Sequence, residues 1–259
     1  MQGPADMLLY ALRVPPGRLH YTPRGNQPDR VKDVMTDSVA PDQMILAIDT
    51  STEQAGIGLF ANGHVASLSW HAGRSQTITL LDQVHRMLAL GGIEAADLTG
   101  IAVATGPGAF TGLRVGMSVA KGFNIALGVP LIGISTLAAA AFPILSPDRV
   151  AIAVVSAGRS RIAWQPFSSG GDGSPTPLEQ PLNSTLAELA EAVLKLHVPL
   201  IIGEFSEMDA AVLVAHGAHV VPASLRLRRP ESLLALASHR FACGEFDDPV
   251  TLEPVYLGR

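Results

Sequence analysis

Cysteine is nearly absent from this sequence: Cys243 is the only one among 259 residues. A single cysteine excludes a disulfide within the chain and a zinc site built from paired cysteines. We expect a cytoplasmic location, where such thiols stay reduced. Basic residues are fewer than acidic ones, 18 Lys and Arg against 23 Asp and Glu, so the formal net charge is −5 at pH 7. This balance gives no electrostatic footprint for nucleic acid, so the chain is not expected to be the main RNA-holding surface of an assembly.

Aromatic residues make up only 5% of the chain and charged residues 16%, whereas hydrophobic residues reach 47%. The core must therefore be built mainly from Ala, Val, Leu and Ile. The length allows one large domain or two lobes of about 100 residues each. The longest apolar run, residues 129–145, nearly reaches membrane-spanning length, but Pro130, Ser135 and Pro143 interrupt it. It predicts a strand, an N-cap and a short helix rather than a membrane segment.

Residues 1–43 differ from the rest of the chain. They are rich in Pro, Arg and Asp, they show no sustained hydrophobic period, and we expect them to be disordered. A regular apolar pattern begins abruptly at Met44. One hypothesis is that Met44 is the natural start and that the preceding residues are an over-long reading frame.

From Met44 the pattern predicts an α/β protein of two lobes, residues 44–145 and 146–259, with a C-terminal tail that could return to the first lobe. In the first lobe, strands are expected at 45–51, 55–63, 64–71, 98–106 and 130–135, with a hairpin turn at Asn62-Gly63. Two long helices are expected at 75–90, capped by Ser75, and at 111–127, capped by Thr111. The second lobe also opens with a strand pair, around a turn near Gly158. It continues with a segment at 168–177 that is either a solvated linker or the tip of a hairpin. Helices are expected from about residue 185, from Ser206 and at 231–244, and strands at 199–204 and 219–221. Two strand-led lobes indicate a duplicated architecture.

The stretch "ATGPGAFTGLRVGMSVAKG", Ala104–Gly122, has the composition of a phosphate-binding loop. The Walker spacing fails, because Lys121 lies more than two helical turns past the loop. The pattern G-x-G-x-x-G fails as well, because Thr111 stands at the third glycine position. Backbone N–H groups at a helix N-terminus still attract anions. A vestigial nucleotide or phosphate site formed by Asp49, Gly106 and Gly108 therefore stays open.

Small residues recur every four positions in the second long helix. One row is Gly112, Gly116 and Ala120, and a second row is Ser118, Gly122 and Ala126. Each glycine inside a helix costs about 1 kcal/mol relative to alanine. The rows make sense where another backbone approaches closely, either this protein's own sheet or another subunit. In the first long helix, Ile78, Leu81, Val84 and Leu88 can face the core, whereas Leu80 and Met87 lie on an adjoining face, which indicates packing on two sides.

Other chemistry finds little support in the sequence. There is no G-x-S-x-G nucleophile motif and no H-E-x-x-H metal motif, and the pair His216 and His219 has no acidic third ligand beside it. Asp49, at the end of the first strand, could hold hydrated magnesium or bond the backbone of residues 50–52 as a turn residue. We favour the turn and predict neither catalytic residues nor a metal site.

Four segments resemble the TsaB family: "ILAIDTSTEQAGIGL", "HAGRSQTITLLDQVHRML", "ATGPGAFTGLRVGMSVAKGFNIALGVPLIGISTLAAAA" and "LEPVYLGR". The resemblance runs from Met44 to Arg259 and is densest up to Ala141. It implies a two-lobed actin-like or sugar-kinase-like ATPase fold with mixed sheets flanked by helices. It also implies a non-catalytic subunit of the bacterial machinery that makes threonylcarbamoyladenosine in tRNA.

The resemblance further implies partners. The family pairs with the catalytic subunit TsaD, a small ATPase called TsaE joins the pair, and tRNA is met only through the complex. This chain would then need no cofactor of its own, since ATP and metal belong to the partner subunits. The pairing surface of the family is built from the two long helices, here Ser75–Leu90 and Thr111–Leu127. The corresponding candidate interface residues are Ile78, Leu81, Gly112, Arg114, Gly116 and Ala120.

The chain departs from the family's sequence pattern at one place, and three alternatives to the subunit interpretation remain. Relatives commonly have Asp-Ala-Arg where this chain has Ser156-Ala157-Gly158, which weakens any magnesium or nucleotide role there. The main alternative function is an ATP-dependent phosphotransferase or ATPase that uses Asp49 and the Gly106–Gly108 loop. A protease is a weaker one, because no nucleophile is visible. Alone, the chain could also form a homodimer through its helix pair.

Overall fold

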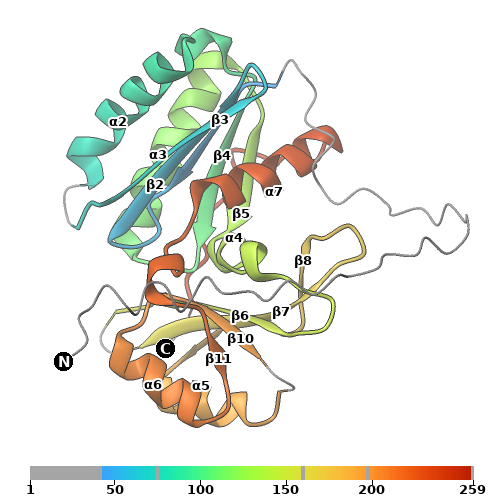
Figure 1. Cartoon of the computed structure of the whole chain (residues 1–259). Helices are drawn as coiled ribbons and strands as arrows, with labels where there is room; N and C mark the ends of the chain where they lie inside the picture. Colours follow the sequence, from blue (N-terminus) through green and yellow to red (C-terminus); the bar gives the residue numbers. More distant parts are fainter. Residues whose placement is uncertain (1–42, 74–75, 159–160, 197–198, 258–259) are drawn as a thin grey trace, which may run out of the picture. The chain divides into compact units, whose positions relative to one another are not determined.

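The computed structural model describes residues 43–73, 76–158, 161–196 and 199–257, which all belong to one compact unit of the chain (Figure 1). The predictions made for residues 1–43, disorder and a start at Met44, concern a segment that lies outside the described residues except for Gln43. Ser75, the expected cap of the first long helix, also lies outside them.

The first sheet has five strands in the order β3-β2-β1-β4-β5. β1 pairs antiparallel with β2 and parallel with β4, so the sheet is mixed. Asn62 and Gly63 join β2 to β3 with φ angles of 54° and 76°, the left-handed values that a tight hairpin turn needs, and the predicted hairpin is confirmed. The strands are β1 Ile45–Asp49, β2 Gln54–Ala61, β3 His64–His71, β4 Gly100–Gly106 and β5 Leu131–Ser135.

The second sheet repeats this plan. Its order is β11-β10-β6-β7-β8, and β6 pairs antiparallel with β7 and parallel with β10, as β1 does with β2 and β4. A short strand, β9, also pairs with β7. The predicted duplicated α/β architecture with two mixed sheets is confirmed, although β8 and β9 were not foreseen. The strands are β6 Ala151–Ser156, β7 Ile162–Ser169, β8 Pro175–Pro177, β9 Leu182–Ser184, β10 Leu200–Gly203 and β11 His219–Val220.

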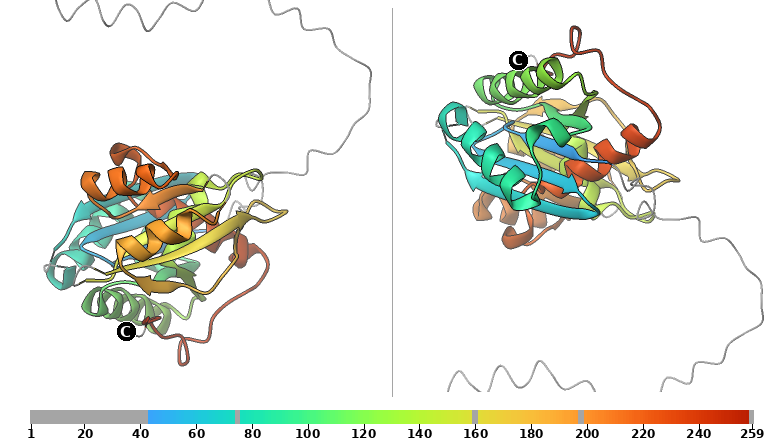
Figure 2. Two further views of the ribbon diagram at one scale, coloured as in Figure 1. Left: turned by 90° about the horizontal axis from the view of Figure 1, so that it is seen from below. Right: turned by 90° about the horizontal axis from the view of Figure 1, so that it is seen from above.

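Helices flank both sheets (Figures 1 and 2). α2 and α3 cover one face of the first sheet, α7 covers the other, and α5 and α6 cover the second sheet. α4 lies between the sheets, because Ala139 packs in the core of the first and Leu137 in the core of the second. The helices are α2 Gln76–Gly91, α3 Phe110–Leu127, α4 Thr136–Ala141, α5 Leu186–Val193, α6 Glu207–Ala215 and α7 Pro230–Ala242, with 3-10 turns η1 Ala95–Asp97, η2 Phe142–Ile144 and η3 Ala223–Leu225.

The apolar run of β1 follows from this layering. Leu46 and Ile48 pack with α2 and α3, while Ile45 and Ala47 pack with α7. A strand that is covered on both faces needs apolar side chains at every position rather than at alternate ones. β1 is accordingly buried along its whole length.

Two predictions of the sequence need correction. α3 begins at Phe110 with Ala109 as its N-cap, so Thr111 lies in the first turn and does not cap the helix. α7 was placed in the second lobe, 146–259, but its Leu233, Leu234 and Ala237 pack on the first sheet. The sequence period shows that α7 is a helix but does not say which sheet its apolar stripe meets.

The segment after α7 also lies on the first sheet. The Asp247 N–H donates to the Leu131 carbonyl at 2.9 Å, and the Val255 N–H donates to the Thr105 carbonyl at 2.7 Å. The tail of the chain is thus fixed along β5 and at the end of β4, next to the glycine-rich loop.

The long apolar run 129–145 forms β5, α4 and η2, as its interruptions predicted. The Ser135 hydroxyl caps α4 by accepting from the Ala138 N–H at 3.4 Å. Within the described residues, no helix combines the length and apolar character needed to cross a membrane.

Candidate functional site

Asp49 ends β1 and is almost fully buried. Its Oδ1 accepts hydrogen bonds from the Ser51 backbone N–H at 2.9 Å and from the Ser51 hydroxyl at 2.5 Å. This is the turn role that the sequence favoured for Asp49. Its other oxygen, Oδ2, accepts from Nε of Arg228 at 2.8 Å, a partner that no sequence motif indicated.

Arg228 lies in the loop between η3 and α7 and is itself buried. Its guanidinium contacts Asp49 through Nε and Glu204 through a second nitrogen, and its third nitrogen donates to the Gln54 carbonyl at 2.7 Å. Burial is the largest single influence on the Arg228 pKa and lowers it, but the charges and hydrogen bonds of Asp49 and Glu204 outweigh burial and raise the pKa above its ordinary value. Arg228 therefore stays charged.

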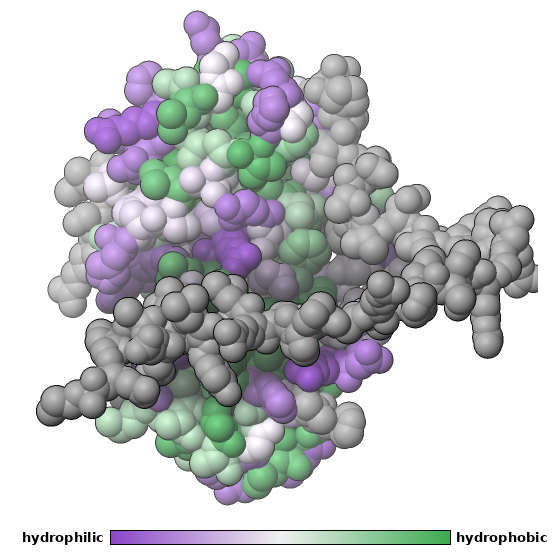
Figure 3. Space-filling model, viewed as in Figure 1, coloured by the Kyte–Doolittle hydropathy of each residue, from purple (hydrophilic) through white to green (hydrophobic). Residues whose placement is uncertain are grey.

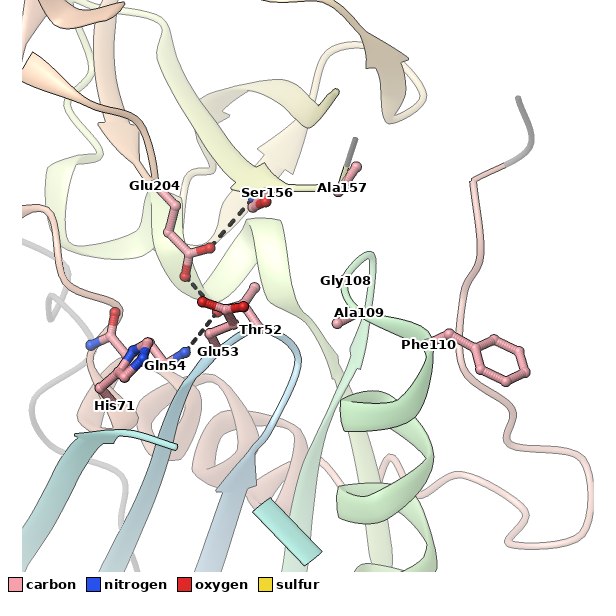
Figure 4. Close-up of a pocket in the computed structure, with 11 residues that line it drawn as sticks. Thr52, Glu53, Gln54, His71, Gly108, Ala109, Phe110, Ser156, Ala157 and Glu204 are labelled. Carbon is pink, nitrogen blue, oxygen red and sulfur yellow. Dashed lines mark hydrogen bonds between the residues drawn. The ribbon is translucent and has the colours of Figure 1, made fainter. Parts of the chain in front are cut away.

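Glu204 follows β10 and comes from the second sheet. It accepts a hydrogen bond from the Thr52 hydroxyl at 2.6 Å and a longer one, 3.4 Å, from the Ser156 N–H (Figure 4). Asp49, Arg228 and Glu204, which we call the acid–arginine cluster, thus join the end of β1 to the end of β10. The sequence analysis missed both Arg228 and Glu204.

The glycine-rich loop packs against the same corner of the first sheet. The Ala109 N–H donates to the Ser51 carbonyl at 2.6 Å, and the Gly106 N–H donates to the Thr136 hydroxyl at 3.1 Å. A Cβ on Gly108 would collide with the Ser51 carbonyl, far inside the 3.0 Å that real Cβ atoms keep. Gly108 is therefore required because two loops approach each other closely here. The backbone amides of Gly106 and Ala109 already donate hydrogen bonds within the protein.

The first small-residue row of α3, which comprises Gly112, Gly116 and Ala120, faces the first sheet and not a partner. The Thr50 hydroxyl donates to the Gly112 carbonyl at 2.7 Å, Gly116 is buried against the same side chain, and Ala120 is fully buried in the core. The assignment of Gly112, Gly116 and Ala120 to a partner interface is therefore wrong. The small residues do allow a close approach, but the group that comes closest to Gly116 is the side chain of Thr50, which directly follows β1 of the same chain.

In α2 the core side consists of Leu80, Val84, Met87 and Leu88, whereas Leu81 is 56% exposed. The expectation that Leu81 can face the core is thus corrected, and its assignment to an outward surface stays a prediction. The side chain of Ile78 lies outside the described residues.

The second small row of α3 is exposed. A Cβ on Gly122 would meet no atom within 4 Å, and Ile125 beside it is 82% exposed. Because α2 and α3 lie next to each other on the sheet, their exposed residues share one side of the first lobe (Figure 1). On the side of the molecule that Figure 3 shows, hydrophilic and hydrophobic residues are interspersed over the first lobe. We call this surface the α2–α3 outer face; it comprises Leu81, Leu90, Ser118, Gly122, Ile125 and Ala126.

Arg114, also named for the interface, is exposed near the N-terminal end of α3. Its guanidinium lies 4.0 Å from the ring centroid of Phe110, and its Nε donates to the Tyr256 hydroxyl at 3.2 Å. The rings of Phe110 and Tyr256 are themselves 5.0 Å apart. The tail of the chain thus completes an exposed aromatic and cationic cluster at the start of α3.

A cavity of about 520 Å³ lies beside these elements. Glu204 reaches into it from the second sheet toward Thr52, and Phe110 points away from them (Figure 4). Ser156, Ala157 and Gly158 also line this cavity, so the position where the sequence departs from the pattern common in TsaB relatives lies there. Within the described residues, no group of three His, Cys, Asp or Glu side chains could hold a metal ion.

Known proteins resemble this chain in sequence and structure. The sequence model of the family described as TsaD, tRNA N6-adenosine threonylcarbamoyltransferase, matches residues 71–176. The tRNA threonylcarbamoyladenosine biosynthesis protein TsaB of Escherichia coli is 28% identical over 228 residues, which are 82% of this chain and 94% of that protein. The protein of the same name in Haemophilus influenzae is 34% identical, over 42% of this chain and 48% of its own length.

Solved structures agree with these matches. YeaZ from Pseudomonas aeruginosa superimposes with a TM-score of 0.69 at 25% identity, over 83% of this chain and all of that one. A Pseudomonas aeruginosa protein described as similar to the peptidase YEAZ gives a TM-score of 0.71 at the same identity and coverage. In its two-sheet fold, and over nearly the full length of the Escherichia coli protein, the chain is similar to TsaB proteins.

Proposed function

We propose that this chain acts in the biosynthesis of threonylcarbamoyladenosine in tRNA, as a non-catalytic subunit that pairs with a TsaD protein and activates it. The observation that carries the proposal is the similarity to the Escherichia coli TsaB protein over 94% of that protein's length. In this proposal TsaE joins the pair, and tRNA, ATP and metal are bound by the complex and not by this chain alone.

The local chemistry supports a non-catalytic role. Asp49, the best-placed carboxylate of the sequence, is held by Ser51 and neutralised by Arg228. The loop amides that could receive a phosphate at Gly106 and Ala109 are bonded within the protein. A phosphotransferase that used Asp49 and this loop would have to break these contacts first, so the geometry favours the subunit over the enzyme.

The α2–α3 outer face supports the pairing. Leu81, Leu90 and Ile125 are 56%, 79% and 82% exposed, and large apolar side chains gathered on one side of a lobe are typical of interaction surfaces. Gly122 has open space above it, which allows the backbone of another helix to come close. We therefore assign the pairing to the exposed row of α3 and not to the buried row that carries Gly116.

Reconstitution tests this function. Threonylcarbamoyl-tRNA synthesis is measured with TsaD, TsaE and threonylcarbamoyl-adenylate, with this chain present or omitted. We expect modification to depend on the chain, and to continue when Asp49→Asn replaces the wild type if that variant folds. Equal synthesis without the chain would overturn the proposal, and ATP turnover by the lone chain that Asp49→Asn abolishes would favour the enzyme.

A further inference from the structure

Arg228 is a buried charge that the pairing proposal does not use. It meets a carboxylate from each sheet, Asp49 at the end of β1 and Glu204 after β10. We propose that Arg228 determines what the Asp49–Glu204 pair can bind: its guanidinium is a built-in counter-cation that excludes divalent cations from these two carboxylates. The inference goes beyond the proposed function and holds whether or not α2 and α3 pair with another protein.

The argument starts from the two carboxylates. Both contact the same guanidinium, Asp49 through Nε and Glu204 through a second nitrogen, so the two carboxylates lie on either side of one cation. Carboxylate oxygens are the ligands that Mg²⁺ and Ca²⁺ prefer in proteins. Asp49 is buried and the Glu204 side chain is only 21% exposed, and two such carboxylates near each other are unfavourable unless a positive charge lies between them. Some cation is therefore required, and here the chain supplies it.

The remaining bonding capacity of the cluster is largely used as well. Asp49 Oδ1 accepts twice from Ser51, Glu204 accepts from Thr52 and Ser156, and Arg228 donates its third nitrogen to Gln54. A divalent cation would have to displace the guanidinium and leave a buried arginine without its two acidic partners. That exchange is costly, because it leaves a buried positive charge without a compensating negative one.

The geometry also explains why arginine is the residue at position 228. A planar guanidinium has five N–H donors in a fixed fork, so it can meet two carboxylates and a carbonyl at once. A lysine ammonium is a point charge and could not span Asp49, Glu204 and Gln54 with the same directions. Pro230, at the start of α7, limits the backbone freedom of the loop that presents Arg228.

A structural role of Arg228 and a cation-excluding role both predict that losing Arg228 destabilises the fold. The two roles differ in their prediction for cation binding, which is therefore the property to measure. Mn²⁺ is titrated into wild type, Asp49→Asn, Arg228→Ala and the triple variant Arg228→Ala/Asp49→Asn/Glu204→Gln, and free Mn²⁺ is followed by electron paramagnetic resonance. We expect Arg228→Ala to gain one site at least about tenfold tighter than any in wild type. The triple variant should lose that site.

Two results overturn the proposal: a Mn²⁺ site in wild type that Asp49→Asn removes, or a folded Arg228→Ala variant that gains none. If Arg228→Ala does not fold in buffer, it is refolded with Mn²⁺ present. The proposal expects Mn²⁺ to raise its yield and its Tm, because a ligand that binds only the folded state stabilises it, and to leave the triple variant unchanged. No rescue by Mn²⁺ would count as a refutation. Failure here leaves the reconstitution result untouched, so the two proposals are tested separately.

Discussion

Thr50 and Gly116 hold β1 and α3 together at a distance that leaves no room for a side chain. The Thr50 hydroxyl occupies the place where a Cβ on Gly116 would lie, and it donates a hydrogen bond of 2.7 Å to Gly112 one turn earlier. A glycine in the interior of α3, which costs helix stability, is here compensated by the close approach of the strand.

Gly116→Ala should therefore destabilise the protein by about 1–3 kcal/mol through overpacking against Thr50. Gly122→Ala is the matched control, because it lies in the same helix with open space around it. It should stabilise the protein by about 0.5–1 kcal/mol, the helix preference of alanine over glycine. Urea unfolding of both variants checks the prediction, and a stable Gly116→Ala variant would contradict the packing described here.

Pairing should depend on the exposed row of α3. Ile125→Asp is expected to weaken binding to TsaD by about 100-fold or more, since it places a charge in an apolar contact. Met208→Asp on α6 is the control, because Met208 is 79% exposed against 82% for Ile125 and lies on the second lobe. Binding is measured by isothermal titration calorimetry, with circular dichroism to verify folding.

The comparison of Ile125→Asp with Met208→Asp decides whether the α2–α3 outer face binds TsaD. If Ile125→Asp and Met208→Asp bind TsaD equally, the α2–α3 outer face is not the pairing surface. The same pair of variants tests self-association of the free chain by multi-angle light scattering. Loss of a dimer in Ile125→Asp alone would assign both contacts to one face.

The glycine-rich loop should respond to substitution through packing. Gly108→Ala forces a Cβ into the Ser51 carbonyl, which is backbone and cannot move aside as a flexible side chain would. We expect a loss of more than about 2 kcal/mol in the free energy of unfolding. The check is chemical denaturation with and without inorganic phosphate. A phosphate-dependent stabilisation of wild type that Gly108→Ala removes would restore the anion-site interpretation.

Part of this structure could be predicted from sequence because it is local. The Asn62-Gly63 turn and the Asp49 turn depend on neighbours in the chain, and both are found. The two small rows of α3 could not be told apart, because spacing shows that a row exists but not which row faces the sheet.

The acid–arginine cluster could not be predicted from the sequence for a different reason. In the segment 225–228, the arginines Arg226 and Arg228 are buried while Leu225 and Leu227 are 48% and 57% exposed. In most proteins leucine is buried and arginine is exposed, which is the reverse of this arrangement. The inversion is possible only because the carboxylates of Asp49 and Glu204 meet Arg228 and Glu207 meets Arg226, and those partners lie 19 to 179 residues away along the chain.

The start of α5 offers a prediction about pH. Glu188 and Thr185 form a capping box, and hydrogen bonds from the Thr185 backbone N–H and hydroxyl lower the Glu188 pKa below its ordinary value. A carboxyl group whose pKa is lower in the folded state stabilises the fold above its unfolded pKa, and this contribution is lost as the pH falls through the folded pKa. Carbon-detected NMR titration should therefore show Glu188 titrating below an ordinary glutamate, and Thr185→Val should move it back upward. A Glu188 pKa that Thr185→Val leaves unchanged would contradict the capping geometry.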